Sequence, residues 1–365
     1  MSSIPRFLLG VLLLFPLALL AQGKKRPDQP LEMSRLPAVP TMPDAFPQVV
    51  GTQVFGPAYK FTKDEAVLEA AKGISAMGSR ILKINAVSGQ QLTPYIAMPF
   101  THYVLWYRST NDWTKGFTPE LKRREYNAVY LFTKDLLTRY DTAGKTFFLG
   151  HWEGDWYLLP DKDVKKDASP ELIAAMIEWL NIRQKAVDDA RAEVSYAKCR
   201  VYTYTEVNRV RDAMKDGRKR LVNAVLPKAN VDFVSYSAYD CQLLPVEEIR
   251  ATLDYVNAQL PAKAGLPAKR VFIGECGLSW KACGGDGVKH DQRNREILAK
   301  FMTWKPAMTL FWQYYNNEVI DGEQVGFWLV DNKNNKTPLH ATLTELFAAQ
   351  EEAAREMRGR TRRLP

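Results

Sequence analysis

From residue 51 to about residue 350, short apolar runs of strand type alternate with longer segments of helical periodicity. Eight such runs occur, at residues 53–55, 80–86, 103–107, 146–153, 199–206, 231–236, 271–275 and 309–314. Runs that are apolar almost without interruption are typical of parallel strands covered on both faces. Eight of them with helices between predict an α/β fold, a single (β/α)8 TIM barrel rather than an open doubly wound sheet.

Helix start signals separate these strands. Thr62 and Glu65 have capping-box spacing, and Thr118 and Ser169 each stand directly before a proline, which suits the first helical position. Further helices are predicted at residues 209–220, 246–259, 291–303 and 338–350. Only residues 87–102 lie between the second and third strands, so this β2–β3 connection is shortened and has room for at most a short helix.

The terminal segments lack this pattern. Residues 7–21 form an apolar run after Arg6, shorter than the ~20 residues that span a bilayer. Residues 1–21 are typical of a cleavable signal peptide, which predicts an exported protein, periplasmic or extracellular, without membrane contact after cleavage. An uncleaved N-terminal membrane anchor is the alternative, because basic residues follow the run. Residues 22–50 hold six prolines and predict a linker, residues 51–350 the folded domain, and residues 351–365 a basic tail.

The net charge of +9 does not indicate a nucleic-acid partner. Five arginines fall within the last eleven residues, so much of the excess lies in the basic tail. Nucleic-acid binding domains usually show Lys and Arg interleaved with aromatic residues on one element, and this chain has no such stretch. With 46% hydrophobic residues, the chain is also too apolar for a disordered protein.

Two apolar runs end in a glutamate: Glu153 is the last residue of the fourth run, and Glu275 is the last residue of the seventh. Catalytic side chains of a barrel of this kind lie at the C-terminal ends of its strands. Regular alternation would place Phe147, Leu149, His151 and Glu153 on one face of their strand, and Val271, Ile273 and Glu275 on one face of theirs. We therefore expect both carboxylates to point toward the barrel axis and to meet over its centre.

Paired carboxylates across an aromatic cleft suit glycoside cleavage, in which one protonates the leaving oxygen and the other attacks or stabilises the anomeric centre. A structural salt bridge at the rim is the alternative for each carboxylate alone. Aromatic side chains provide apolar faces for sugar rings, although each one could also be core packing. The aromatic candidates for substrate binding are Trp152, Trp156, Tyr236, Tyr239, Trp280, Trp312 and Tyr314.

Several segments resemble the clan A retaining glycoside hydrolases, a superfamily of (β/α)8 barrels. The similarity is carried by HWEGDW (151–156), VSYSAYD (234–240), IGECG (273–277), LFWQYYNNE (310–318) and GFWLVDNKNNKTPLHATL (326–343). The resemblance implies Glu153 as acid/base and Glu275 as nucleophile. It also implies that Tyr236 or Tyr239 hydrogen-bonds the nucleophile, and that Trp312 forms the floor of the subsite next to the cut bond.

The sequence departs from this superfamily at one position. Most members have Asn directly before the acid/base, where it contacts the sugar 2-hydroxyl, and here Trp152 holds that place. His151, one residue earlier, could be a polar substitute or a histidine packed inside the barrel. Glu206 and Asn208 follow the fifth strand and could line the cleft, with a salt bridge at the rim as the alternative.

No motif predicts a metal or an organic cofactor. The four histidines (His102, His151, His290 and His340) lack metal-ligand spacing, and the four cysteines form no CxxC pair. Export would favour oxidised thiols. Cys276 could then pair with Cys283, with Cys241 as an alternative partner for either, while Cys199 is expected to be buried and free.

Together these features predict an exported, monomeric, retaining glycosidase that hydrolyses a β-linked oligo- or polysaccharide without a cofactor. A catalytically inactive carbohydrate-binding barrel and a transglycosylase are the two alternatives. A separation of ~5–5.5 Å between the two carboxyl groups would indicate retention, and one of ~6.5–9.5 Å inversion.

Overall fold

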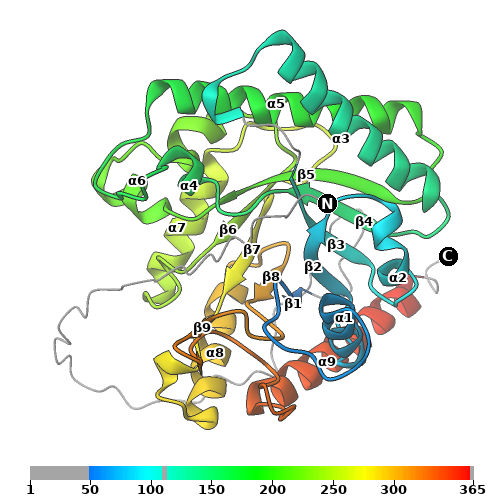
Figure 1. Cartoon of the computed structure of the whole chain (residues 1–365), viewed down its shortest axis with the longest axis vertical. Helices are drawn as coiled ribbons and strands as arrows, with labels where there is room; N and C mark the ends of the chain where they lie inside the picture. The colour runs from blue at the N-terminus through cyan, green and yellow to red at the C-terminus, as the bar shows by residue number, and fades with distance from the viewer. Residues whose placement is uncertain (1–48, 109–112, 362–365) are drawn as a thin grey trace.

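The computed structural model describes residues 49–108 and 113–361, and it contains a closed barrel of eight parallel strands (Figure 1). Each strand pairs with the next, and β8 pairs with β1 to close the ring. The strands are β1 (Val50–Gln53), β2 (Ile81–Ala86), β3 (His102–Tyr107), β4 (Thr146–Gly150), β5 (Arg200–Val207), β6 (Phe233–Ser237), β7 (Val271–Cys276) and β8 (Thr309–Phe311). The predicted (β/α)8 barrel is confirmed.

Helices surround the barrel, as Figure 1 shows. The longer ones are α1 (Ala66–Ala76), α3 (Pro119–Arg139), α5 (Pro170–Glu193), α6 (Val210–Asp216), α7 (Val246–Ala258), α8 (Gly287–Met302) and α9 (Pro338–Thr361). Shorter helical turns are η1 (Gln90–Leu92), α2 (Thr93–Ile96), η2 (Trp113–Lys115), α4 (Asp155–Leu158), η3 (Leu221–Val225), η4 (Leu226–Lys228) and η5 (Lys281–Cys283). A small hairpin, β9 (Val319–Ile320) and β10 (Glu323–Gln324), follows β8. The connection between β2 and β3 holds only η1 and α2, so its predicted shortening is also confirmed.

Two of the three predicted helix caps are correct. The hydroxyl of Thr118 accepts a hydrogen bond from the backbone of Leu121, and that of Ser169 accepts one from Leu172. The capping box at Thr62 is wrong. The carboxylate of Glu65 caps α1 instead, and the Thr62 hydroxyl donates to Glu69.

Other boundaries also differ from the prediction. The first strand begins at Val50, three residues earlier than expected, because its backbone pairs with both β2 and β8. Helix α8 begins at Gly287 rather than at residue 291, with Asp286 as its cap. Helix α9 continues to Thr361, so most of the predicted basic tail belongs to a helix. The predicted signal peptide and almost all of the predicted linker lie outside the described residues.

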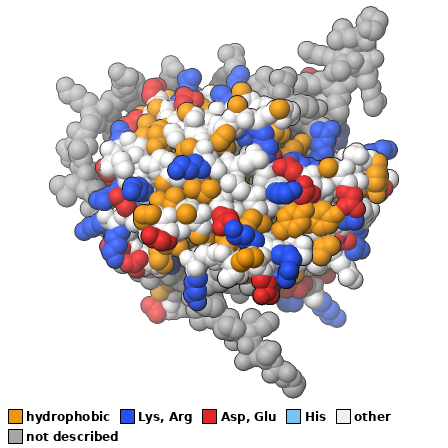
Figure 2. Space-filling view, turned by 90° about the horizontal axis from the view of Figure 1, so that it is seen from above, with side chains coloured by type: hydrophobic (Ala, Val, Ile, Leu, Met, Phe, Trp, Pro, Cys, Tyr) orange, Lys and Arg blue, Asp and Glu red, His pale blue; other side chains and the backbone are white. Residues whose placement is uncertain are grey.

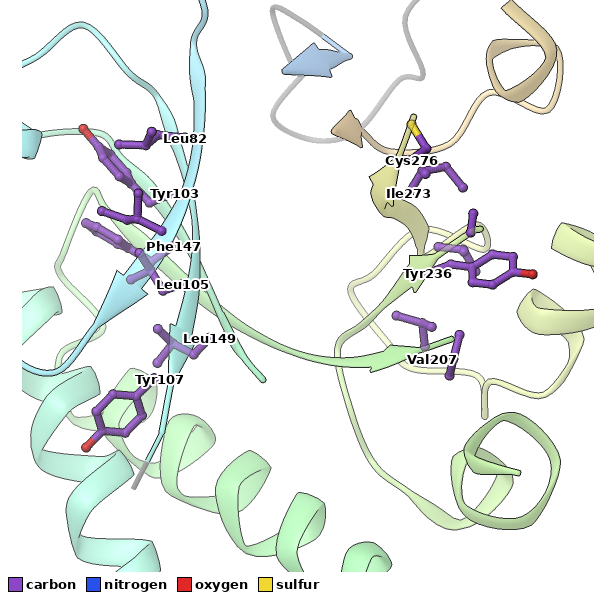
Figure 3. Close-up of a cluster of buried hydrophobic side chains, with 14 of the residues drawn as sticks. Leu82, Tyr103, Leu105, Tyr107, Phe147, Leu149, Val207, Tyr236, Ile273 and Cys276 are labelled. Carbon is purple, nitrogen blue, oxygen red and sulfur yellow. The ribbon is translucent and has the colours of Figure 1, made fainter. Parts of the chain in front are cut away.

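The strands bury two separate apolar layers. Inside the barrel, large side chains from alternating positions fill the axis: Ile81, Val104, Phe148, Tyr204, Phe233, Phe272, Met308 and Leu310. The opposite faces of the strands pack against the helices, and Figure 3 shows part of this outer layer: Phe147, Leu149, Tyr236 and Ile273 are labelled there. Each fully buried side chain of this size contributes ~1.5–3 kcal/mol of burial free energy.

This layering corrects the predicted strand faces. Phe147, Leu149 and Ile273 face the helices, not the axis. Phe148 and Phe272 point inward instead. Regular alternation through to Glu275 would therefore have turned its carboxylate outward, away from the barrel mouth.

The outer surface over α3 and α5 shows acidic and basic side chains interspersed with apolar ones (Figure 2). Basic side chains do not gather into one patch on this face. Among the described residues, we also find no helix that combines the length and apolarity required to cross a membrane.

Candidate active site

A β-bulge in β7 turns Glu275 into the barrel. The pairing with β6 aligns Tyr236 with Ile273 but Ser237 with Glu275, so Gly274 is an extra residue in the ladder. A Cβ on Gly274 would lie 1.8 Å from the Ser235 hydroxyl oxygen, so only glycine fits beneath the site. Because of this extra residue, Glu275 shares the inward side with Ser237 although Ile273 faces outward.

Glu153 reaches the site because β4 ends before it. The strand was predicted to continue through Glu153, but its last residue is Gly150. The chain then turns, and the backbone amide of Glu153 donates to a carboxylate oxygen of Glu206, 3.1 Å away. The next amide, that of Gly154, donates to the backbone carbonyl of Glu206 at 2.8 Å. These two bonds to β5 hold Glu153 at the barrel mouth.

The two carboxylates meet at the hydroxyl of Ser237. Its Oγ lies 2.5 Å from Oε1 of Glu153 and 3.5 Å from Oε2 of Glu275. These two oxygens are therefore at most 6.0 Å apart, the sum of the two distances. For this pair of oxygens, the upper limit lies below the ~6.5–9.5 Å expected between the carboxyl groups of inverting glycosidases.

An aromatic side chain donates a further hydrogen bond to each carboxylate. The indole Nε1 of Trp156 lies 2.6 Å from Oε2 of Glu153. The hydroxyl of Tyr239 lies 3.5 Å from Oε2 of Glu275. Both donors come from loops that follow barrel strands, as expected for a site at the C-terminal ends of the strands.

A buried lysine lies beneath the carboxylates. The ammonium of Lys83, on β2, is 2.9 Å from Oε2 of Glu206 and 3.4 Å from Oε1 of Glu275. It also donates to the carbonyl of Gly274 at 3.0 Å. Glu206 accepts a further bond, from the Ser235 hydroxyl at 2.6 Å. The side chains of Lys83 and Glu206 are fully buried, so their ion pair lies in the barrel interior. The salt bridge at the rim that was the alternative for Glu206 is therefore wrong in its location.

Burial dominates the electrostatics of both carboxyls. It raises the pKa of Glu153 to about 7, against the lowering effect of the bonds from Ser237 and Trp156. Burial raises the pKa of Glu275 well above its ordinary value, and the Lys83 ammonium is the main influence that opposes this rise. Glu153 can therefore hold a proton near neutral pH, whereas the Glu275 carboxylate has a positive partner within hydrogen-bond reach.

An aromatic cluster stands beside the carboxylates. Phe55, Trp312 and Phe327 are buried together, with Trp106 and Tyr239 packed against them. Phe55 stacks on Trp312 with ring centroids 5.5 Å apart. Trp106 lies over Lys83, with 4.9 Å from the ammonium to the ring centroid, within the range of a cation–π interaction. Trp312 thus lies beside the site as expected, although Phe55 covers one face of its ring.

Trp152, which takes the place of the usual Asn, belongs to the edge of this aromatic wall. Its ring centroid lies 6.4 Å from that of Trp106. An indole has no acceptor and only one donor, so it cannot replace both functions of a carboxamide.

Four other candidates lie away from the carboxylates. His151 is in the layer between the barrel and α5, bonded to Thr205 at 2.7 Å and packed against Trp179. The hydroxyl of Tyr236 faces outward and donates to Asp240. Tyr314 packs against Tyr315 and His340. Trp280 stacks on Trp328. Of the two tyrosines proposed for the nucleophile, only Tyr239 contacts Glu275.

Sequence reasoning missed Lys83, Ser235 and Ser237. A signal for Lys83 was present, since it is the one charged residue within the apolar run 81–86. A lysine in the middle of a parallel strand has no route to solvent and must find a buried anion. The two serines gave no comparable signal, because small polar residues are common in strands.

The four cysteines, Cys199, Cys241, Cys276 and Cys283, are all buried free thiols, so none of the disulfides considered above is formed. Cys199 is buried and free as predicted. Within the described ranges, no group of three or more His, Cys, Asp and Glu side chains is arranged to hold a metal ion.

No family model matches the sequence, and no curated protein matches it. Solved structures do match the fold. A family 39 glycoside hydrolase from Bacteroides cellulosilyticus WH2 superposes with a TM-score of 0.55 at 12% identity, over 82% of this chain and 63% of that one. The present chain therefore spans less than two thirds of that protein.

Two further structures match over nearly their whole length. The endo-1,4-beta-xylanase XylE of Penicillium canescens has a TM-score of 0.51 and 14% identity, over 83% of this chain and 94% of its own. A GH5-4 broad-specificity endoglucanase from Clostridium longisporum has a TM-score of 0.51 and 9% identity, over 85% and 96%. At these identities the similarity establishes a shared (β/α)8 fold. The resemblance to clan A barrels is thus confirmed for the fold.

Proposed function

We propose that this protein is a retaining glycoside hydrolase that cleaves β-linked glycans. The observation that carries the proposal is the meeting of Glu153 and Glu275 at one serine hydroxyl, with oxygens no more than 6.0 Å apart. Fold and site are independent supports, because a fold alone does not specify a reaction. The fold is that of solved xylanase and endoglucanase structures.

The roles follow from the surroundings of the two carboxyls. Glu153, whose pKa is raised to about 7, protonates the glycosidic oxygen as the bond to the leaving sugar breaks. Glu275, paired with the Lys83 ammonium, attacks the anomeric carbon and forms a glycosyl ester. The ionised Glu153 then takes a proton from water, which attacks the same carbon and releases the sugar and the Glu275 carboxylate.

Ser237 and Tyr239 support this division. Ser237 donates to Glu153 in this structure and also reaches Glu275. Once Glu153 is protonated, its proton can be donated to the serine oxygen, and the serine hydroxyl can turn toward Glu275. Tyr239 gives Glu275 a second donor that favours the ionised form.

The test is a screen of β-linked polysaccharides and chromogenic β-glycosides with the wild-type protein and three variants. We expect hydrolysis by wild type with release of the β-anomer first, as followed by proton NMR. Glu275→Gln and Glu153→Gln should each lower kcat at least 1000-fold on substrates with poor leaving groups, consistent with the loss of a group that acts in the transition state. Glu178→Gln, at an exposed carboxyl of α5, is the control and should match wild type. First release of the α-anomer would rule out retention.

The second candidate is a carbohydrate-binding barrel without turnover, and Trp152 favours it. The indole in place of the usual Asn leaves the sugar 2-hydroxyl without a carboxamide partner. Glycan binding of equal affinity by wild type and Glu275→Gln, with no hydrolysis by either, would support this candidate over the hydrolase.

We also propose that residues 1–21 direct export of the chain. The support is the short apolar run 7–21 followed by a proline-rich segment. Expression in a bacterial host followed by mass spectrometry of the protein from the periplasm and the medium should give a mature N-terminus at or near Gln22. An intact Met1 or Ser2 terminus in the membrane fraction would instead indicate the anchor.

A further inference from the structure

We propose that the buried ion pair of Lys83 and Glu206 positions both catalytic carboxylates, with Lys83 favouring the ionised form of Glu275 and Glu206 fixing the backbone that carries Glu153. This inference rests on the proposed function for its catalytic consequence. The pair lies below the reacting groups, so both members are positioning residues that act through Glu153 and Glu275.

A count of buried charge is the first support. Glu153, Glu206 and Glu275 are at most 9% exposed, and among the described residues Lys83 is the single cation paired with the last two. An isolated buried carboxylate costs several kcal/mol and tends to take up a proton. One ammonium shared by two carboxylates therefore decides how readily Glu275 ionises.

The geometry of Glu206 is the second support. Its Oε2 accepts from Lys83 and Ser235, and its Oε1 accepts from the backbone amide of Glu153. Three donors therefore hold both oxygens of this carboxylate in place. Because Oε1 holds the amide of Glu153 itself, a shift of Glu206 moves the acid/base relative to the glycosidic bond.

Two further contacts fix the position of the Lys83 ammonium. The ring of Trp106 lies over the ammonium, and the carbonyl of Gly274 accepts its third proton. Gly274 is the bulge residue that turns Glu275 inward. The same lysine thus bonds to the bulge and to the carboxylate that the bulge presents.

Other titratable groups face Glu275 and must be separated from Lys83 in a pH experiment. Glu153 and Glu206 are the carboxyls, Tyr204 and Tyr239 the phenols, and Cys276 the thiol. Burial raises the pKa of both phenols and of the thiol, so none of these three ionises in the acidic range.

The decisive experiment compares the loss of the Glu206 charge alone with the loss of both charges of the ion pair. Glu206→Gln removes the anion that competes for Lys83, and we expect the acidic limb of the pH profile of kcat/KM to move to lower pH by about one unit. Lys83→Met/Glu206→Gln removes one charge of each sign, and we expect the same limb to move up by at least one unit with kcat reduced at least 100-fold. Lys83→Arg should restore part of kcat.

The matched control is the exposed ion pair of Lys134 and Glu193, which lies far from the site on α3 and α5. Lys134→Met/Glu193→Gln should keep the wild-type profile. A purely structural role of the buried pair would lower the amount of folded protein in all its variants without moving either limb, and such a result would overturn the proposal.

A second readout does not depend on turnover. Carboxyl ¹³C NMR titration, with the Glu275 resonance assigned by its loss in Glu275→Gln, should show the same two opposite shifts of its pKa. If wild type hydrolyses no glycan but the shifts occur, the proposed function fails and the role of the ion pair stands. If Glu275 titrates identically in all variants, the ion-pair proposal is wrong. Where the double variant does not fold, Glu206→Gln alone should still lower the pKa of Glu275, and Lys83→Arg, which keeps the positive charge, should leave it close to the wild-type value. An unchanged Glu275 titration in Glu206→Gln would then overturn the proposal.

Discussion

At the scale of single residues, the site contains two glutamate side chains whose tendency to ionise depends on their neighbours. Glu153 is buried against two uncharged donors, whereas Glu275 has the Lys83 ammonium. Desolvation favours the neutral carboxylic acid, and a nearby cation favours the carboxylate. Environment alone therefore separates the acid/base from the nucleophile in our proposal.

This contrast predicts a pH-dependent stability difference between wild type and Glu153→Gln. The pKa of Glu153 is about 7 in the folded state and 4.5 ordinarily, so its contribution to stability is present below pH 4.5 and is lost as the pH rises through about 7. Gln lacks this titration, so between pH 4 and pH 8 the variant should gain about 3 kcal/mol relative to wild type. Urea unfolding at pH 4, 6 and 8 measures the difference, and parallel curves for the two proteins would contradict it.

At the scale of elements, irregular positions place the functional groups. The regular parts of β4 and β7 present apolar side chains to both layers. Glu153 follows the early end of β4, and Glu275 follows the bulge at Gly274. Bulges are common beside active sites because they redirect a side chain without breaking the sheet.

Gly274→Ala should therefore disrupt the site and destabilise the fold. The added Cβ would meet the Ser235 oxygen at 1.8 Å and Oε2 of Glu206 at 2.7 Å, and both are buried and bonded. Overpacking of this kind costs about 1–3 kcal/mol, measurable by urea unfolding, and activity should fall with it. Gly89→Ala is the control, since its Cβ would meet the far end of the partly exposed Asp135 side chain, at the surface of the molecule. Equal effects of the two substitutions would argue against a special role for the bulge.

At the scale of the whole molecule, the barrel axis carries both the core and the site. Phe148, Phe233 and Phe272 fill the lower part, and the ion pair of Lys83 and Glu206 lies above them. Closure of the sheet buries this stack fully, which makes the buried pair strongly dependent on good geometry.

Phe272→Ala should leave a cavity under the ion pair and lower the free energy of unfolding by about 3–5 kcal/mol. Phe61→Ala removes the same side chain from a position that is 39% exposed, and we expect a change below about 1 kcal/mol. Chemical denaturation of both variants and wild type makes the comparison. A loss at Phe272 no larger than that at Phe61 would show that the axis is not the main core.

The sequence alone determined the barrel, most helix starts and the two strand-end glutamates, because hydrophobic period, caps and prolines act within a few residues. Tertiary structure decided the rest. Regular alternation gave the wrong strand face at Ile273, since a bulge is a property of paired strands and not of one strand. It gave the wrong face at Phe147 because β4 ends at Gly150, before Glu153. Tertiary structure also decided that Tyr239, and not Tyr236, contacts Glu275. It brought Lys83 to Glu206, which is 123 residues away in the chain. Such contacts depend on barrel closure, which brings distant strands together at one axis.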